Sequence, residues 1–233
     1  MNILVYILLG VAVLMAGVFI ALSKGQRGLL SLALKSIASF CFTVLALTIC
    51  YFKGLWLFGL LISIGLVASC FGDVILGLPD MPEMKKKATA LTLIGGLAFA
   101  IAHVFYLSAM ISRFGFAWWV VLVAVALGLV FFFGNKFIGK LDYGKLTGGM
   151  PVYATFVSLV VAESIMAFVS GANVYGAIML LVGFVMFWLS DIVLMNIYFG
   201  GHNDKVNQKL YYYNLASYYL GQILIASSLI FLL

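Results

Sequence analysis

Five residues able to take part in acid–base chemistry lie inside long apolar stretches of this 233-residue sequence: Lys35, Asp73, His103, Glu163 and Asp191. A charged side chain in such surroundings is costly, so these residues usually face the interior of a helix bundle and mark a functional site. Two carboxylates with a lysine can divide the acid and base roles of a hydrolysis, or they can relay an ion.

Polar side chains at helical spacing accompany these five residues. His103 and Tyr106 are three residues apart and would share one helix face. A second stripe, with a spacing of four residues, consists of Asn214, Tyr218 and Gln222. A polar stripe on a membrane helix does not face lipid, so we expect both stripes to border a common polar pocket.

The composition indicates an integral membrane protein. Hydrophobic residues make up 66% of the sequence and charged residues 9%, against roughly 45–50% and about 25% in soluble domains. The mean hydropathy is +1.23. We therefore predict an all-α, polytopic transmembrane helix bundle, with residues 1–233 forming one integral membrane domain that binds no nucleic acid.

Eight apolar stretches approach the length of about 20 residues that a bilayer-spanning helix needs. The predicted helices span residues 3–22, 29–51, 55–77, 88–112, 115–134, 150–170, 174–199 and 210–232. The first has no Lys or Arg before it, so we expect a membrane helix rather than a cleaved signal peptide. Very short connections predict that the second and third, fourth and fifth, and sixth and seventh helices are antiparallel neighbours.

Lysine and arginine are distributed unequally between the two ends of these helices. One end carries ten of them: Lys24, Arg27, Lys85, Lys86, Lys87, Lys136, Lys140, Lys145, Lys205 and Lys209. The other end carries Lys53 and Arg113. The positive-inside rule assigns the ten-charge end to the cytoplasm, so we expect both termini outside, in a multi-pass protein of the cell (plasma or inner) membrane.

A weak internal repeat relates the two halves of the sequence. Residues 71–76 (FGDVIL) resemble residues 189–194 (LSDIVL), and the offset from Asp73 to Asp191 is 191 − 73 = 118 residues. The same offset brings Lys35 onto Tyr153. Both segments run in the same direction, so a parallel repeat of four plus four helices is a hypothesis, although six matches in an apolar alphabet also arise by chance.

Lys35, Asp73 and Asp191 fall at similar depths. At 1.5 Å per residue, Asp73 lies roughly 6 Å and Asp191 roughly 12 Å from the inner ends of their helices, and Lys35 is about as deep. We expect these three residues to meet in a cavity open toward the cytoplasm, surrounded by the second, third, fourth, seventh and eighth helices. A purely neutralising Lys–Asp pair is the alternative. For Glu163, farther out, we expect a structural or interfacial role.

Several chemistries lack the residues that they need. His103 and His202 are the only histidines, which excludes the three-histidine zinc site of membrane-embedded ceramidases and adiponectin-receptor-like hydrolases. No H-E-x-x-H or G-x-S-x-G motif is present. We therefore expect no metal and no cofactor. A Ser/His arrangement with Ser69, Ser108 or Ser190 stays open, without specific support.

A set of short motifs, taken in order, resembles a known family. The motifs are Lys35, Gly72-Asp73, His103 with Tyr106, Ser190-Asp191, and Tyr218-Tyr219 followed by Gln222. In a chain of this length and helix number they resemble the YhhN-type family, the lysoplasmalogenases. The resemblance covers nearly the whole chain.

This resemblance implies hydrolysis of the vinyl ether bond of a lysoplasmalogen, a lysophospholipid, to a fatty aldehyde and a glycerophospho-alcohol. Asp73 and Asp191 would be the catalytic pair, with Lys35 beside them. Enol ethers hydrolyse by protonation at carbon, which requires an acid and a carboxylate that acts as base or stabiliser. Which aspartate has which role stays open. The substrate-binding residues would be His103, Tyr106, Ser190, Asn214, Tyr218 and Gln222.

Two other classes of function stay open. A small proton- or ion-coupled membrane transporter could use the same carboxylates, although the third and seventh helices have no clear Gly/Pro break at mid-membrane. A non-enzymatic lipid-binding or scaffold protein would tolerate replacement of both aspartates. For the enzyme, the expected partners are the lysophospholipid substrate and the lipid bilayer, and the sequence does not indicate an oligomeric state.

Overall fold

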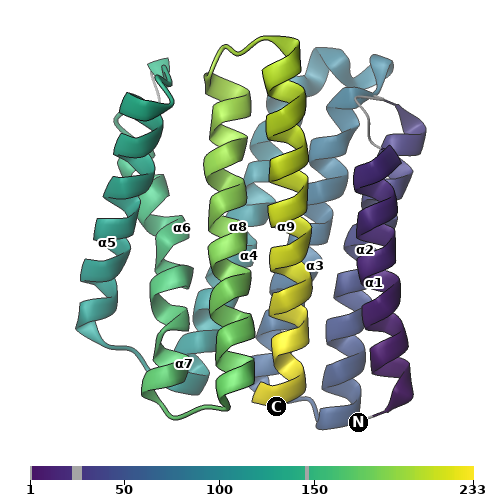
Figure 1. Cartoon of the computed structure of the whole chain (residues 1–233), viewed down its shortest axis with the longest axis vertical. Helices are drawn as coiled ribbons and strands as arrows, with labels where there is room; N and C mark the ends of the chain where they lie inside the picture. Colours follow the sequence, from purple (N-terminus) through teal and green to yellow (C-terminus); the bar gives the residue numbers. More distant parts are fainter. Residues whose placement is uncertain (1, 23–27, 145–146) are drawn as a thin grey trace.

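The computed structural model describes residues 2–22, 28–144 and 147–233, which form a bundle of long helices (Figure 1). The helices are α1 Ile3–Leu22, α2 Leu29–Lys53, α3 Leu57–Gly77, α4 Ala88–Phe114, α5 Trp118–Phe133, α6 Met150–Ser164, α7 Met166–Val169, α8 Val174–Phe199 and α9 Asp204–Leu232. Short helices η1 Leu78–Asp80 and η2 Pro82–Lys87 precede α4, and the π-helix η3 Gly134–Ile138 extends α5. Eight segments of the described chain are long and apolar enough to cross a membrane.

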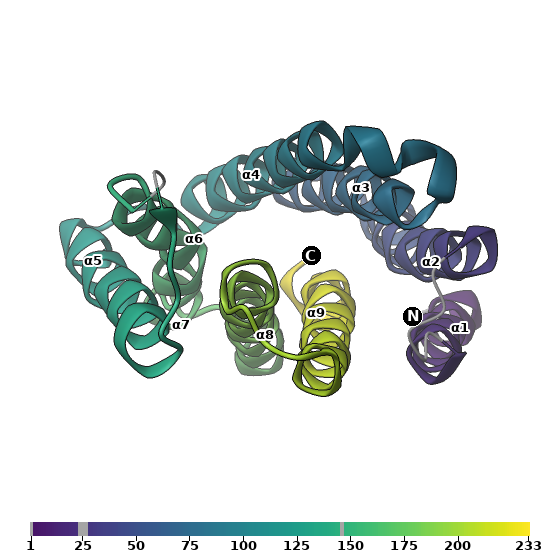
Figure 2. The same cartoon turned by 90° about the horizontal axis from the view of Figure 1, so that it is seen from above.

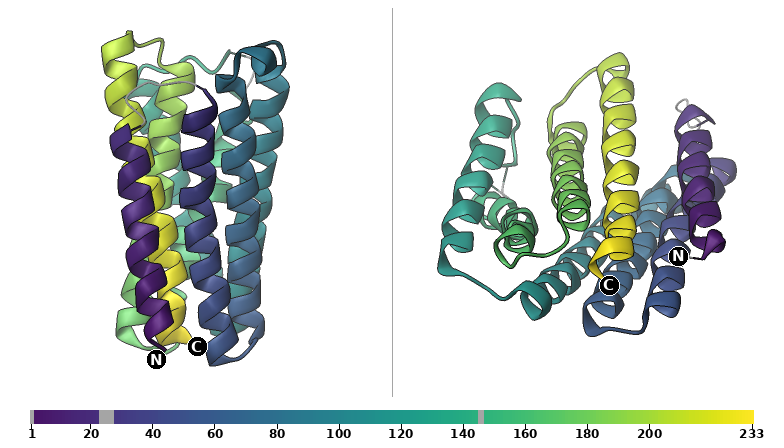
Figure 3. Two further views of the ribbon diagram at one scale, coloured as in Figure 1. Left: turned by 90° about the vertical axis from the view of Figure 1, so that its right-hand side faces the viewer. Right: turned by 60° about the horizontal axis from the view of Figure 1, so that its bottom comes forward.

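Both termini lie at the same end of the bundle, as an even number of crossings requires (Figures 1 and 3). The η1 and η2 turns, η3 and the α8–α9 connection lie at the opposite, lysine-rich end. The charge bias predicts that this end faces the cytoplasm. Of the residues behind that prediction, Lys24, Arg27 and Lys145 lie outside the described residues.

Several observed helix ends differ from the predicted ones, and three helices differ in ways that affect the description of the fold. The last helix begins at Asp204 rather than 210, because the side chain of Asn203 accepts a hydrogen bond from the backbone N of Val206 at 3.0 Å and caps a polar first turn. The fifth continues through η3 to Ile138. The sixth is interrupted at Ile165, which separates α6 from α7. Hydropathy marks the part of a helix inside the bilayer and does not detect polar extensions or local breaks.

The packing order shows which predicted neighbours are in contact. α2 packs against α3, and α6 packs against α8, as expected from their short connections. The expected pairing of the fourth and fifth helices is wrong, because α6 packs against both α4 and α5 and lies between them (Figure 2). Gly115, with φ of 78°, and the extended Ala117 lead the chain away from α4 before α5 begins.

The two halves of the bundle repeat one packing order. In the first half α1 packs on α2, α2 on α3 and α3 on α4, and in the second half α5 packs on α6, α6 on α8 and α8 on α9. The halves meet where α9 contacts α1, α2 and α3 and where α6 contacts α4 (Figures 2 and 3). This order is the one that a parallel repeat of four plus four helices requires.

Glycine allows α8 and α9 to approach closely. A Cβ atom on Gly221 would lie 2.8 Å from the carbonyl O of Gly183, and one on Gly183 would lie 3.0 Å from the carbonyl O of Gly221. Small residues at such crossings allow membrane helices to pack backbone to backbone. This contact holds Tyr218 of α9 and Phe187 of α8 side by side, with ring centroids 5.5 Å apart.

Candidate functional site

Asp73 lies at the centre of a buried polar cluster. It is in α3, one turn before the helix ends at Gly77, and it is 2% exposed. Its Oδ2 accepts hydrogen bonds from Ser39 Oγ at 2.6 Å and from Tyr218 Oη at 2.5 Å. The Nζ atom of Lys35 lies 3.3 Å from Oδ1. Three donors from α2 and α9 therefore converge on one carboxyl group.

Tyr219 extends this cluster by contacting Ser39 and the backbone of Lys35. Its Oη lies 3.1 Å from Ser39 Oγ and 3.3 Å from the backbone carbonyl O of Lys35. A serine hydroxyl has one proton, and Ser39 gives it to Asp73. Tyr219 also has one proton, for which the Lys35 carbonyl O and Ser39 Oγ are the two nearby acceptors. The side-chain donors around Asp73 all point toward it, and this arrangement favours an ionised carboxylate.

A second buried layer lies one helical turn toward the end that holds the termini. It consists of Ser69, Tyr106 and Gln222. Ser69 precedes Asp73 by four residues on α3, Gln222 follows Tyr218 by four residues on α9, and Tyr106 of α4 lies between them. Tyr106 Oη donates to Gln222 Oε1 at 3.1 Å, so Ser69 Oγ, also 3.1 Å away, donates to Tyr106. The amide Nε2 of Gln222 is buried without a partner among the described residues.

His103 belongs to an aromatic wall beside these two layers. Its Nδ1 lies 2.8 Å from the carbonyl O of Phe99. A carbonyl only accepts, so Nδ1 carries the hydrogen and Nε2 of the neutral ring is left as an acceptor. The ring centroid of His103 lies 4.8 Å from that of Phe187 and 6.1 Å from that of Phe156. Helices α4, α6 and α8 thus form a mainly apolar wall.

Asp191 is buried on α8 but does not join the Asp73 cluster. Its Oδ2 is buried, and no described residue forms a hydrogen bond or an ion pair with its carboxyl group. No hydrogen bond or ion pair joins Asp191 to Lys35 or Asp73, so the expectation that the three border one cavity stays a prediction. α3 and α8 do not pack along each other, and Tyr218, which binds Asp73, contacts Phe187 of α8.

Ser190 and Asn214 bind backbone atoms near Asp191. Ser190 Oγ donates to the carbonyl O of Phe187 at 2.6 Å, and Asn214 Nδ2 donates to the carbonyl O of Ser190 at 2.8 Å. The second bond joins α9 to α8 next to Asp191. These contacts position the Asp191 segment and use the only proton of the Ser190 hydroxyl.

Glu163 lies outside this group of residues. It is fully buried near the end of α6, and neither carboxylate oxygen has a partner among the described residues. It lies two residues before Ile165, where α6 is interrupted. No described contact links it to Asp73 or Asp191, in agreement with its predicted separation from the other acids.

One family matches the segment that carries all of these residues. The model of the YhhN family matches residues 30–229, from the first turn of α2 to the last turns of α9. The chain belongs to the YhhN family. For this YhhN protein, membership supports a lysoplasmalogenase-like, hydrolytic function at the level of the family. No curated protein and no solved structure gives a significant match.

Three hydroxyl residues of the YhhN protein's site had no role assigned from the sequence, although Ser69 was an open nucleophile candidate and Tyr219 was part of a family-like motif. Ser39 and Ser69 lie four residues from Lys35 and Asp73 on the same helix faces, a spacing that could have identified them. Tyr219 follows Tyr218 directly, and consecutive residues of a helix point in different directions, so spacing alone does not predict that both contact the same cluster. In the part of the chain that the structure describes, no three His, Cys, Asp or Glu residues are grouped so as to hold a metal ion.

Proposed function

We propose that this YhhN-family protein is a membrane-embedded hydrolase that cleaves the vinyl ether bond of lysoplasmalogens to a fatty aldehyde and a glycerophospho-alcohol. Family membership supports the class of reaction. The observation that carries the proposal is the contrast between two buried aspartates. Asp73 has three donors, whereas Asp191 has no hydrogen-bond or ion-pair partner among the described residues.

These environments favour opposite charge states. Lys35 and two hydroxyl donors offset the cost of burying Asp73 as a carboxylate. Asp191 has no such partner in the described chain, and burying an unpaired carboxylate costs far more than burying the neutral acid. Hence Asp191 is the acid of the proposed reaction and Asp73 is the base.

The reaction begins when Asp191 transfers its proton to the vinyl carbon distant from the ether oxygen. The resulting oxocarbenium ion is stabilised by the negative charge of Asp73. Water adds to the carbon next to oxygen and gives one proton to Asp73. The hemiacetal then collapses: its hydroxyl proton passes to Asp191, the carbon–oxygen bond to glycerol breaks, and Asp73 returns its proton to the glycerol oxygen. One water is consumed, and both aspartates regain their starting states.

Gln222 is suited to hold the attacking water. Its Nε2 is a buried donor without an acceptor among the described residues, and such an orphaned group costs about 1–3 kcal/mol. Gln222 lies one turn beyond Tyr218, which is about 6 Å along α9. A water that accepts from Gln222 and donates to Asp73 would span two hydrogen bonds of about 2.9 Å each.

The bundle also offers matching surroundings to the two parts of the lipid. The rings of Phe99, Phe156 and Phe187 provide an apolar wall for the alkenyl chain. The phosphate would lie toward the lysine-rich end, where Lys86 and Lys87 are exposed and attract anionic groups. The vinyl ether lies between these two parts of the molecule, as the proposed site requires.

Purified protein incubated with three lysolipids tests the proposal. A 1-alkenyl lysolipid should release aldehyde, whereas a saturated 1-alkyl ether and a 1-acyl ester should not, because neither has an enol ether to protonate. Asp73→Asn and Asp191→Asn should each abolish aldehyde release, and the exposed Asp204→Asn should retain it. Absence of aldehyde from the alkenyl lipid, or near-normal turnover by both buried variants, would refute the proposal.

One observation favours the alternative of an ion-coupled transporter. Glu163 is fully buried without a partner among the described residues, and a carboxyl group buried in a membrane helix can bind or relay an ion. Against this, α3 and α8, which carry the two aspartates, are continuous. The test is solute flux in proteoliposomes. If the parent protein transports solute but releases no aldehyde, and if Glu163→Gln stops the flux, the transporter would replace the hydrolase proposal.

A further inference from the structure

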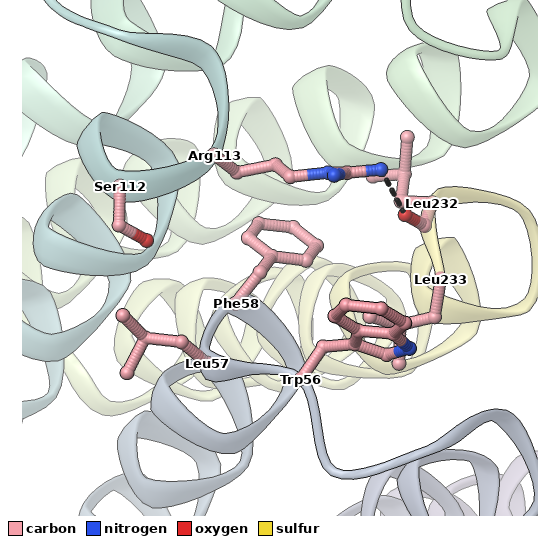
Figure 4. Close-up of a pocket in the computed structure, with 7 residues that line it drawn as sticks. All are labelled: Trp56, Leu57, Phe58, Ser112, Arg113, Leu232 and Leu233. Atoms are coloured by element: carbon pink, nitrogen blue, oxygen red, sulfur yellow. Dashed lines mark hydrogen bonds between the residues drawn. The ribbon is translucent and has the colours of Figure 1, made fainter.

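A pocket of about 310 Å³ opens at the end of the bundle that holds both termini (Figure 4). It forms where α3 begins and where α4 and α9 end, and its lining includes Trp56, Phe58, Arg113 and Leu232. Phe58 precedes Asp73 by 15 residues on α3, so the pocket lies about 22 Å from the proposed catalytic level. We call it the outer pocket.

Arg113 brings a positive charge to the outer pocket without a carboxylate partner. One Nη donates to the carbonyl O of Leu232 at 3.3 Å, and no described residue forms an ion pair with the guanidinium group, which has five N–H donors. The connections at this end, residues 54–56, 115–117 and 170–173, contain no Asp or Glu. The one acid in the outer half of the helices, Glu163, is fully buried.

Other polar groups of the outer pocket are already engaged. Trp56 Nε1 donates to the carbonyl O of Lys53 at 3.1 Å, and Ser112 Oγ donates to the carbonyl O of Ala109 at 2.7 Å. Because one helix begins here and two end here, the helix dipoles do not by themselves favour an anion. Arg113 is the charged side chain of the pocket lining, and it extends past Phe58 toward Leu232 (Figure 4). The α-carboxylate of Leu233, which also lines the pocket, forms no ion pair with it.

We propose that the outer pocket binds a phosphate group at the outer membrane surface. The planar guanidinium fork matches the oxygens of a phosphate, and the remaining N–H donors of Arg113 are available for it. The ends of spanning helices lie near the lipid headgroups, and the apolar side chains around Arg113 can contact the glycerol and first chain carbons of a phospholipid. A free phosphate ion shares the anionic chemistry. The site is independent of the proposed hydrolysis.

Thermal unfolding of the detergent-purified protein, titrated with three probes, tests this site. The probes are a short-chain diacyl phosphatidylglycerol, inorganic phosphate and a short-chain diacylglycerol. Phosphatidylglycerol should raise the unfolding temperature, and Arg113→Gln should weaken its apparent Kd about tenfold or more, as expected when a charge-assisted phosphate contact is lost. Arg113→Lys should retain part of the affinity. Lys53→Gln, at the same end but outside the pocket lining, should bind as the parent does.

The probes separate the two sources of phosphate. Stabilisation by inorganic phosphate equal to that by the lipid, and lost in Arg113→Gln, would identify a free-phosphate site. Equal stabilisation of Arg113→Gln and the parent, or equal stabilisation by diacylglycerol and phosphatidylglycerol, would overturn the proposal. Circular dichroism and size-exclusion profiles of each variant establish that a lost response does not reflect unfolding.

Discussion

Replacing Asp73 by asparagine should lower both the activity and the stability of the protein. The carboxylate accepts bonds from Ser39 and Tyr218, and each weakens by about 1 kcal/mol when a charged acceptor becomes neutral. Lys35 also loses its counter-charge, at a cost limited by the 15% exposure of its side chain, which allows it to turn toward the membrane surface. The expected loss in the free energy of unfolding is about 2–4 kcal/mol.

The same substitution at Asp191 should leave stability almost unchanged. No described residue forms a hydrogen bond or an ion pair with this carboxyl group, so asparagine removes no native interaction, and we expect a change within about 1 kcal/mol. Activity should nevertheless fall about 10²- to 10⁴-fold, the usual contribution of a general acid. Asp73→Asn should lose activity to a similar degree.

Two assays check these expectations. Reversible unfolding in mixed micelles gives the stability of each variant, and aldehyde release gives its activity. Asp204→Asn, which changes an exposed aspartate in the first turn of α9, serves as the matched control and should behave as the parent in the activity assay. If Asp191→Asn is destabilised as strongly as Asp73→Asn, then Asp191 carries a partnered charge and the division into acid and base fails. Normal turnover of Asp191→Asn would refute its role directly.

Three further outcomes are expected from the same contacts. Tyr218→Phe removes the 2.5 Å bond to Asp73 and should cost about 1.5–3 kcal/mol in unfolding free energy, most of which should vanish in an Asp73→Asn background. Gln222→Leu removes the orphaned Nε2 donor and also the acceptor of Tyr106 Oη, so kcat should fall and the free energy of unfolding should drop by about 1–3 kcal/mol; an unchanged kcat would contradict its role in holding water. A plot of aldehyde release against pH should be bell-shaped, because activity is lost at low pH when Asp73 gains a proton and at high pH when Asp191 loses one. A rate that does not change with pH would exclude the two aspartates as the acid–base pair.

The spanning helices were predictable because long apolar runs and charged connections determine where a chain can cross lipid. The helix over residues 174–199 was placed at its observed ends, since Asn173 caps its start and Gly200 follows its last turn. The packing of α5 was not predictable from its short connection to α4, because side-chain fit selected α6 as its neighbour. The break at Ile165 carried no glycine or proline signal.

The candidate site was predictable in depth but not in direction around each helix. The rise per residue placed Lys35 and Asp73 at a common level, and the structure pairs them at 3.3 Å. Apolar periodicity is weak in a helix that is hydrophobic on all sides, so it could not show that Asp191 makes no direct contact with that pair. Ser39 was missed, and Tyr219 was named in a motif without a role, for a related reason: hydroxyl groups occur throughout these helices, and only their orientation places them in the Asp73 cluster.

The repeat hypothesis offers a simple source for the two different aspartates. Asp73 and Asp191 occupy matching positions of the two halves, and the position that matches Lys35 holds Tyr153, because 35 + 118 = 153. Lys35 supplies the counter-charge of Asp73, whereas Tyr153, within electrostatic range of Asp191, supplies no charge. One cation in one half and none in the other would turn two similar motifs into a base and an acid. A vinyl ether hydrolase needs that asymmetry, because two equally paired carboxylates would leave no proton for the first step.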